Sequence, residues 1–321
     1  MECVFSHSRG SASPCLVDDC LFMYDEHKIT WRKLTGGVAG TVQLSSGIDF
    51  MSKVKGGVIF DQLDGEVSTI CMLSTEGKYY EYKSFYSAKN NIIRSSYDDE
   101  RVLLYTRCSC DSDCTILQDK LMVITHDMDI ILSMEIRPID KAILMRNGHV
   151  GILDNGLFTV YDAEGKVKDN VWLGDVYPLH PIMELYDGRI MITHNDIVCL
   201  HPLNNKPFKF FRVKDRWMMT DAIQLFDGRV LIMSSSMMYI YTTDGALDKF
   251  YIIEKESRKV LQLYDGRIAL YYRNIIDVYS LNGIIEDSYS MKNDIHSIIE
   301  IGKDRLMIEQ DRFSDMRVCY N

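Results

Sequence analysis

The chain has 321 residues, of which 46% are hydrophobic, and its formal net charge is −10 with a pI near 5.3. This acidic balance argues against general nucleic-acid binding, which needs an excess of Lys and Arg for phosphate contacts. No run of about 18 apolar residues is present to form a membrane helix. The nine cysteines are odd in number and scattered, which favours a reducing cytoplasmic or nuclear compartment over secretion.

Residues 1–14 are small and polar, lack the apolar stretch of a signal peptide, and are expected to form a flexible tail. Strand-like segments follow at 21–24, 28–33 and 41–44, with apolar and aromatic residues in short runs. A further group, residues 58–82, contains Asp-Gly between two apolar runs. Because no linker composition interrupts the chain, residues 15–321 are predicted to form one domain.

The most regular part of the sequence is a phrase made of an apolar run, Asp-Gly or Asn-Gly, and a second apolar run. It occurs at residues 143–152, 182–191, 223–232 and 261–270, with glycines at positions 148, 188, 228 and 266, so the spacings are 40, 40 and 38 residues. Asp-Gly and Asn-Gly favour two-residue hairpin turns. Two more strand-like runs follow each hairpin. Four strands in a period of 38–40 residues predict the blades of a β-propeller.

Weaker copies of the phrase, at positions 65, 100 and 304, raise the number of repeats to seven. The last repeat is one strand short, because only residues 306–308 and 316–320 follow its turn. We therefore predict an all-β fold, a single propeller of seven four-stranded blades, clear from about residue 57. One of the N-terminal segments named above would close the ring and remove an exposed sheet edge. The alternative is eight blades, with residues 16–24 starting an additional one.

The phrase apolar-x-apolar-x-Asp-Gly-Arg-apolar, followed by an apolar-aromatic-polar strand end, resembles a degenerate WD-repeat propeller. The closest match is Tyr161-Asp162, which stands where that family places Trp-Asp; Tyr241-Thr242 and Tyr279-Ser280 are weaker equivalents. No Trp-Asp dipeptide occurs, and no blade carries a clean Gly-His start. The resemblance covers roughly residues 57–321 and implies a rigid scaffold that docks other macromolecules.

The residues that follow the first turn of each blade should form a ring on one face of a propeller. These residues are Arg101, His149, Arg189, Arg229, Arg267 and Arg305. A positive ring on an acidic protein would engage an acidic or phosphorylated protein partner through bidentate pairs. The alternative is local pairing, in which Asp187 binds Arg189 and Asp227 binds Arg229 within their own hairpins.

The opposite face should carry the variable loops, including Lys-Asp-Arg-Trp-Met-Met at 214–219. Arg and Trp are enriched in interface hot spots. A second set of partner-binding residues is therefore predicted on this face: His194, Arg216, Trp217, Arg273 and Arg312. For Trp217 the alternative is a place in the core between blades.

Sequence motifs for catalysis are missing: the eight histidines form no His-x-His or His-Glu-x-x-His, and no Gly-x-Ser-x-Gly or phosphate-binding loop occurs. We therefore expect neither catalytic residues nor a cofactor. The weak metal candidate is Cys108, Cys110 and Cys114 with His126, which together offer thiolate and imidazole ligands to zinc. Their spacing differs from that of zinc knuckles, and the alternative is a solvated loop of free thiols.

The predicted function is that of a noncatalytic protein–protein interaction scaffold. Two alternatives remain. One is a structural component of a large assembly such as a virus particle, for which self-association is expected. The other is a propeller enzyme of hydrolase or lyase type.

Overall fold

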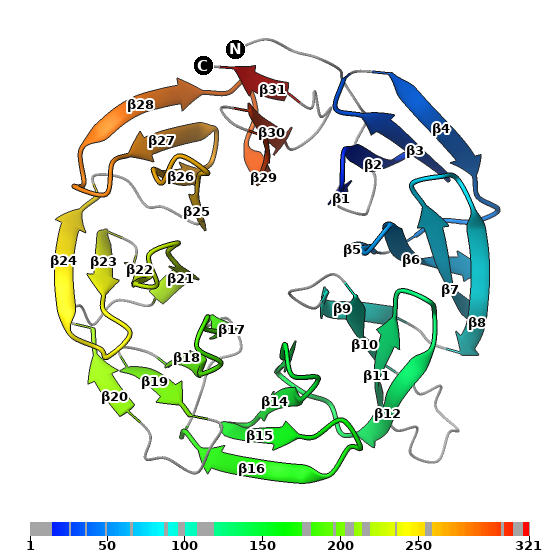
Figure 1. Cartoon of the computed structure of the whole chain (residues 1–321), viewed down its shortest axis with the longest axis horizontal. Helices are drawn as coiled ribbons and strands as arrows, with labels where there is room; N and C mark the ends of the chain where they lie inside the picture. Colours follow the sequence, from blue (N-terminus) through cyan, green and yellow to red (C-terminus); the bar gives the residue numbers. More distant parts are fainter. Residues whose placement is uncertain are drawn as a thin grey trace. The chain divides into compact units, whose positions relative to one another are not determined.

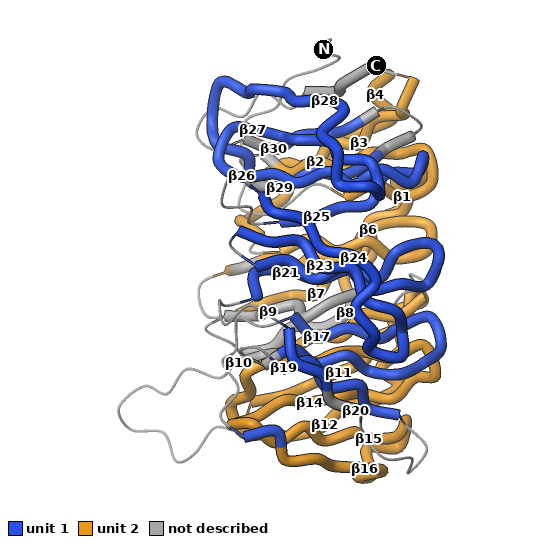
Figure 2. Tube along the Cα trace, turned by 90° about the vertical axis from the view of Figure 1, so that its left-hand side faces the viewer, with its two compact units in different colours: residues 1–6, 173–321 blue, residues 7–172 orange. Residues whose placement is uncertain are grey.

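The structure is a computed structural model that describes residues 15–25, 27–35, 37–48, 50–64, 67–86, 89–95, 100–107, 119–174, 181–194, 197–202, 209–213, 219–234, 236–253, 259–302, 305–310 and 317–320. Within these residues the regular elements are all β-strands, and no helix occurs. The chain has two compact units, His7–Trp172 and Leu173–Asn321, which Figure 2 colours orange and blue. The all-β prediction is confirmed for the described residues.

The unit His7–Trp172 contains four four-stranded sheets. The first comprises β1 (Cys15–Val17), β2 (Cys20–Asp25), β3 (Lys28–Lys33) and β4 (Val38–Gln43). The second comprises β5 (Met51–Val54), β6 (Gly57–Asp64), β7 (Val67–Ser74) and β8 (Tyr79–Tyr86). The third comprises β9 (Lys89–Ser95), β10 (Arg101–Arg107), β11 (Asp119–Thr125) and β12 (Ile130–Ile136). The fourth comprises β13 (Lys141–Leu144), β14 (Val150–Asp154), β15 (Leu157–Tyr161) and β16 (Val167–Trp172).

The unit Leu173–Asn321 contains three four-stranded sheets and one sheet of three described strands. The fifth sheet comprises β17 (Ile182–Glu184), β18 (Ile190–His194), β19 (Ile197–His201) and β20 (Lys209–Arg212). The sixth comprises β21 (Met219–Gln224), β22 (Val230–Ser234), β23 (Met237–Tyr241) and β24 (Leu247–Ile252). The seventh comprises β25 (Lys259–Gln262), β26 (Ile268–Tyr272), β27 (Ile275–Tyr279) and β28 (Ile285–Ser290). The eighth comprises β29 (Ile295–Gly302), β30 (Arg305–Gln310) and β31 (Arg317–Tyr320).

Every sheet is an antiparallel meander in which strands consecutive in sequence are neighbours in space (Figure 1). In the sixth sheet Gln224 pairs with Val230, Val230 with Tyr241, and Tyr241 with Leu247. The first-to-second and third-to-fourth turns of a sheet therefore lie at one end, and the second-to-third turn lies at the other. We call the first of these the turn end.

The core lies between neighbouring sheets of a unit, which explains why the second strands are apolar without alternation. All five residues of β22 are buried. Val230 and Ile232 pack against the fifth sheet, whereas Leu231 and Met233, on the opposite face, pack against the seventh. In contrast, the fourth strand β24 alternates between half-buried and exposed residues, because successive side chains of a strand point to opposite faces. Stacking thus buries both faces of a sheet that alone would bury neither.

The described residues form eight sheets, one more than the seven that the sequence analysis preferred and equal to its alternative. The difference arises at the N-terminus, where the segments expected to close a ring pair instead with one another as β2, β3 and β4. The prediction that one of them completes the last sheet is therefore wrong for the described strands. Position 65 lies outside the described residues; the connection between β6 and β7, which contains it in sequence, joins a second to a third strand, so the repeat counted from this position is one strand out of register.

Candidate interaction surface

The Asp-Gly-Arg turns have a different geometry from the two-residue hairpins expected from sequence. In the sixth sheet the Leu225 N–H donates to the Arg229 carbonyl and the Gly228 N–H to the Leu225 carbonyl. Within the turn from Leu225 to Arg229, only Gly228 has a positive φ, at +90°. This is a type I turn followed by a left-handed glycine, which suits Asp at the second central position. The expected two-residue turn with an Asp-Gly centre needs a positive φ at both central residues, and Asp227 has none, so that expectation is wrong for this turn.

Each Asp of these turns holds the Arg two residues later. Asp227 Oδ1 accepts the Arg229 backbone N–H at 3.1 Å, while its Oδ2 accepts Nε at 2.9 Å and Nη2 at 2.6 Å. Asp187 and Arg189 repeat this arrangement at 3.1, 2.8 and 2.6 Å. Asp265 accepts the Arg267 backbone N–H at 3.0 Å and its Nε at 2.7 Å. Local pairing, the alternative left open by the sequence, is thus what these three turns adopt.

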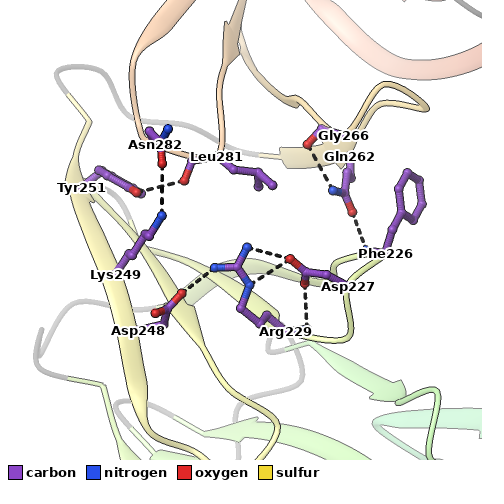
Figure 3. Close-up of polar contacts among 10 residues, drawn as sticks. All are labelled: Phe226, Asp227, Arg229, Asp248, Lys249, Tyr251, Gln262, Gly266, Leu281 and Asn282. Atoms are coloured by element: carbon purple, nitrogen blue, oxygen red, sulfur yellow. Dashed lines mark hydrogen bonds and ion pairs between the residues drawn. The ribbon is translucent and has the colours of Figure 1, made fainter.

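A second carboxylate from the fourth strand approaches the same guanidinium group in two of the sheets. Asp248 of β24 binds Arg229 Nη1, so Arg229 lies between two carboxylates (Figure 3). In the seventh sheet, Asp287 Oδ2 lies 2.9 Å from Arg267 Nη1, and Glu286 Oε2 lies 3.9 Å from the same atom. The two arginine side chains are 23% and 21% exposed. Little of either guanidinium group remains for a further anion.

The pairing changes the acidity of the paired groups. Hydrogen bonds from Arg229 hold the pKa of Asp227 below its ordinary value, although partial burial opposes the shift. Burial alone would raise the pKa of Asp187, but hydrogen bonds from Arg189 outweigh it and the pKa is lowered. The Asp227 carboxylate in turn raises the pKa of Arg229. All of these pairs are therefore charged near neutral pH.

At the turn end of the unit Leu173–Asn321, neighbouring sheets are joined by the side-chain amide of a Gln or the carboxylate of a Glu. The sequence patterns did not indicate these residues. Gln262 Oε1 accepts the Phe226 N–H of the preceding sheet at 2.7 Å, and its Nε2 donates to the Gly266 carbonyl at 3.1 Å (Figure 3). Gln224 makes the same pair of bonds to the Tyr186 N–H, at 2.5 Å, and to its own turn. The sequence signal was the Gln that stands two residues before Phe226 and before Tyr264.

The eighth sheet uses a carboxylate for the same contact. Glu300 Oε2 accepts the Tyr264 N–H at 2.7 Å. Three successive bonds therefore hold the first turns of the fifth, sixth and seventh sheets each to the next sheet.

Exposed aromatic residues occupy the position before the Asp in these turns, and the sequence analysis did not single them out. Tyr186 is 40% exposed, Phe226 55% and Tyr264 65%. Each occupies the first central position of its type I turn.

The remaining members of the expected ring are placed as follows. Arg101 begins β10 and donates from Nη2 to the Arg146 carbonyl in the first turn of the fourth sheet, at 2.8 Å. His149 Nδ1 lies 3.2 Å from Asn147 Nδ2 within its own turn. Arg305 begins β30, and its side chain is outside the described part of the structure. All six residues therefore stand at or next to the start of a second strand, as the period predicted.

The set expected at the opposite end is only partly described. Arg273 is exposed in the β26–β27 turn with φ +44°, and His194 ends β18, so both lie at the end predicted for them. The His194 side chain, Arg216, Trp217 and Arg312 lie outside the described residues. Tyr161, Tyr241 and Tyr279 end the third strands of their sheets.

The candidate zinc ligands Cys108, Cys110 and Cys114 lie outside the described residues, whereas His126 is described. Among the described residues, no three His, Cys, Asp or Glu side chains are grouped as metal ligands. The His126 ring lies beside a cavity of about 500 Å³ in the unit His7–Trp172, which Lys55, Lys78 and Glu81 also line. Lys55 pairs with Glu100 at 2.8 Å and Lys78 with Glu76 at 3.0 Å. Both lysines of the lining are therefore already paired with carboxylates.

Within the described part of the chain, no helix is long and apolar enough to cross a membrane. No protein-family model matches the sequence, and no curated protein matches it. The solved structures, by contrast, contain clear likenesses to the fold.

BamB from Moraxella catarrhalis is similar over 98% of this chain and 96% of its own, with 10% identity and a TM-score of 0.66. Sqt1 from Saccharomyces cerevisiae is similar over 94% of this chain and 92% of its own, with 8% identity and a TM-score of 0.65. Virginiamycin B lyase from Staphylococcus aureus is similar over 84% of this chain and 94% of its own, with 14% identity and a TM-score of 0.60. At these identities the likeness shows the fold alone, which is that of a β-propeller.

Proposed function

We propose that the protein is a noncatalytic protein-interaction scaffold. The observation that carries this proposal is the repeated turn end of the unit Leu173–Asn321, where three identical Asp-Gly-Arg turns are presented by successive sheets. Each turn is held to the next sheet by a hydrogen bond that its backbone N–H donates to a side-chain oxygen of Gln224, Gln262 or Glu300. A surface that is fixed before binding loses little conformational entropy when a partner docks, which favours recognition of another macromolecule.

The finer architecture is part of the same proposal. The eight sheets are taken as the eight blades of one propeller, in place of seven blades closed by an N-terminal strand. The eight-blade alternative from the sequence matches the number of described sheets. Small-angle X-ray scattering tests it, because a closed ring and two separate units give different distance distributions. A profile with two separated maxima would count against a single ring.

The charge of the partner is the point on which sequence and structure favour different answers. An acidic or phosphorylated partner requires accessible guanidinium groups. Arg189, Arg229 and Arg267 each already bind a carboxylate of their own turn. A partner that binds these arginines must displace that carboxylate, so the pairing opposes an acidic partner at this end. The opposite end, where Arg273 is exposed and where the sequence predicts Arg216 and Trp217, remains a second proposed docking surface.

The test is affinity purification from the native source with three baits, analysed by mass spectrometry. The baits are the wild type, the triple variant Arg189→Glu, Arg229→Glu, Arg267→Glu, and Trp217→Ala. A scaffold is expected to retain a reproducible set of partners that one variant loses while its melting temperature stays within a few degrees of wild type. Recovery of the protein alone would instead favour a structural assembly component, and sedimentation at micromolar concentration would then show self-association. If the triple Arg variant lost its fold together with its partners, the loss of binding would follow from unfolding, and a specific role of the turn end in binding would be unsupported.

A further inference from the structure

Three large aromatic side chains are exposed at equivalent positions of three successive sheets. Tyr186, Phe226 and Tyr264 each precede the Asp of an Asp-Gly-Arg turn, and between 40% and 65% of their surface is exposed. Single exposed aromatic residues are common on protein surfaces. Repetition at one structural position is different, because it gathers the rings at one end of the unit. Tyr, Trp and Phe are enriched in protein interfaces.

The inter-sheet hydrogen bonds determine how the rings are arranged. The backbone N–H groups of Tyr186 and Phe226 are each bound by a Gln that stands two residues before the next ring: Gln224 precedes Phe226, and Gln262 precedes Tyr264. The rings therefore form a row, one ring per sheet. Packed sheets are separated by about 10 Å and an extended chain advances about 3.3 Å per residue. An extended segment that runs along the row would meet a new ring roughly every third residue.

The charged groups beside the rings are predominantly negative. Six carboxylates lie within 3.9 Å of the three guanidinium groups, and they belong to Asp187, Asp227, Asp248, Asp265, Glu286 and Asp287. The set carries three more negative than positive charges. The arginine side chains are 20–23% exposed, whereas the carboxylate side chains are 29–45% exposed. A docking partner meets the carboxylates first.

We infer that the row of Tyr186, Phe226 and Tyr264 is a docking surface for an extended basic segment of a protein partner. Lys or Arg side chains of that segment stack on the ring faces through cation–π contacts and pair with the adjacent carboxylates. The inference rests on the proposed scaffold function and names the partner's chemistry at one end of it. An acidic segment would face repulsion from these carboxylates, and a purely apolar one would leave them desolvated without a partner.

The experiment measures the binding of a fluorescein-labelled peptide of about nine residues, with Arg at every third position and Gly and Ser between, by fluorescence anisotropy. A second peptide carries phosphoserine at the same positions. The test variant replaces Tyr186, Phe226 and Tyr264 by Ser. The matched control replaces Phe250 and Ile252 by Ser, since these side chains of β24 are 53% and 75% exposed but lie away from the turns.

The wild type should bind the basic peptide, and the ring variant should bind it about 10- to 100-fold more weakly, as expected for the loss of three exposed cation–π contacts. The control variant should remain within about twofold of wild type, because both variants keep the full charge of the protein. An unchanged Kd in the ring variant would overturn the inference, since the attraction would then be nonspecific charge. Tighter binding of the phosphoserine peptide, or no binding of the basic peptide at about 1 mM, would overturn it too.

Failure of this inference and failure of the scaffold function give different results. If affinity purification with the wild type recovers native partners, and the variant that lacks the three aromatic rings recovers them too, the scaffold function stands and the basic docking surface is wrong. If the wild type retains none, the scaffold function itself is wrong.

Discussion

The bond between neighbouring sheets at Gln262 gives a quantitative test of how the turn end is held together. Its side chain is 8% exposed, accepts the Phe226 N–H at 2.7 Å and donates to the Gly266 carbonyl at 3.1 Å. Replacement by Leu keeps the apolar stem but removes both hydrogen bonds. Each such bond contributes about 1 kcal/mol net to stability. The free energy of local opening at this turn should therefore be about 1 to 2 kcal/mol lower in the variant, because water can reach the freed groups.

The chain supplies a matched control for this variant. Glu300 makes the equivalent contact to the Tyr264 N–H with a carboxylate. Gln262→Glu should therefore keep the bond to Phe226 and lose only the donor to Gly266, with an effect between those of wild type and the Leu variant. Gln224→Leu should show a loss of the same size at Tyr186, because Gln224 makes the same two bonds.

Hydrogen exchange followed by mass spectrometry is the appropriate assay, since it reports the opening of one segment rather than of the whole chain. A loss of 1 to 2 kcal/mol corresponds to roughly 5- to 30-fold faster exchange of the peptide that contains Phe226. Peptides from the unit His7–Trp172 serve as internal controls and should be unchanged. The reasoning would be refuted if the Phe226 peptide of Gln262→Leu exchanged at the wild-type rate.

Three further predictions concern the turns and the core. Gly228 has φ +90°, and no heavy atom lies within 4 Å of the position that a Cβ would take; Gly37 is equally open but has no positive φ. In urea denaturation, Gly228→Ala should therefore lower the free energy of unfolding by about 1–2 kcal/mol, whereas Gly37→Ala should leave it almost unchanged. Because Arg229 lowers the pKa of Asp227, the stability from this pair is present above the unfolded pKa of about 3.9 and is lost as pH falls through the lower folded pKa. The melting temperatures of wild type and Asp227→Asn should therefore converge towards pH 2, and a constant gap would contradict this. Burial raises the pKa of the Cys71 thiol to about 11, so at pH 8 peptide mapping should find Cys71 alkylated by iodoacetamide only after unfolding.

Local chemistry made the strands and turns predictable. Apolar runs separated by Asp-Gly gave the hairpins of the sixth and seventh sheets, and the period gave four strands per sheet. The same repeated motif predicted that Arg229 stands at the start of a second strand. The N-terminal sheet was only the alternative interpretation of the sequence, because β2 lacks an Asp-Gly turn before it. Its connection to β1 is Asp18-Asp19, and Asp18 takes the left-handed φ of +53° that glycine provides elsewhere.

By itself, the sequence determined the fold class, the period and the end of each sheet at which the arginines stand, since these depend on residues close together in the chain. Only the tertiary structure decided what the arginines bind and which turns are joined. Asp248 reaches Arg229 from 19 residues away, and Gln262 reaches Phe226 from 36 residues away. Such contacts form only when strands pair and sheets stack. Packing then brings together side chains that are distant in the sequence, and no local sequence pattern predicts which of them meet. The same packing turned an expected positive ring into a row of paired, net negative turns with exposed aromatic rings.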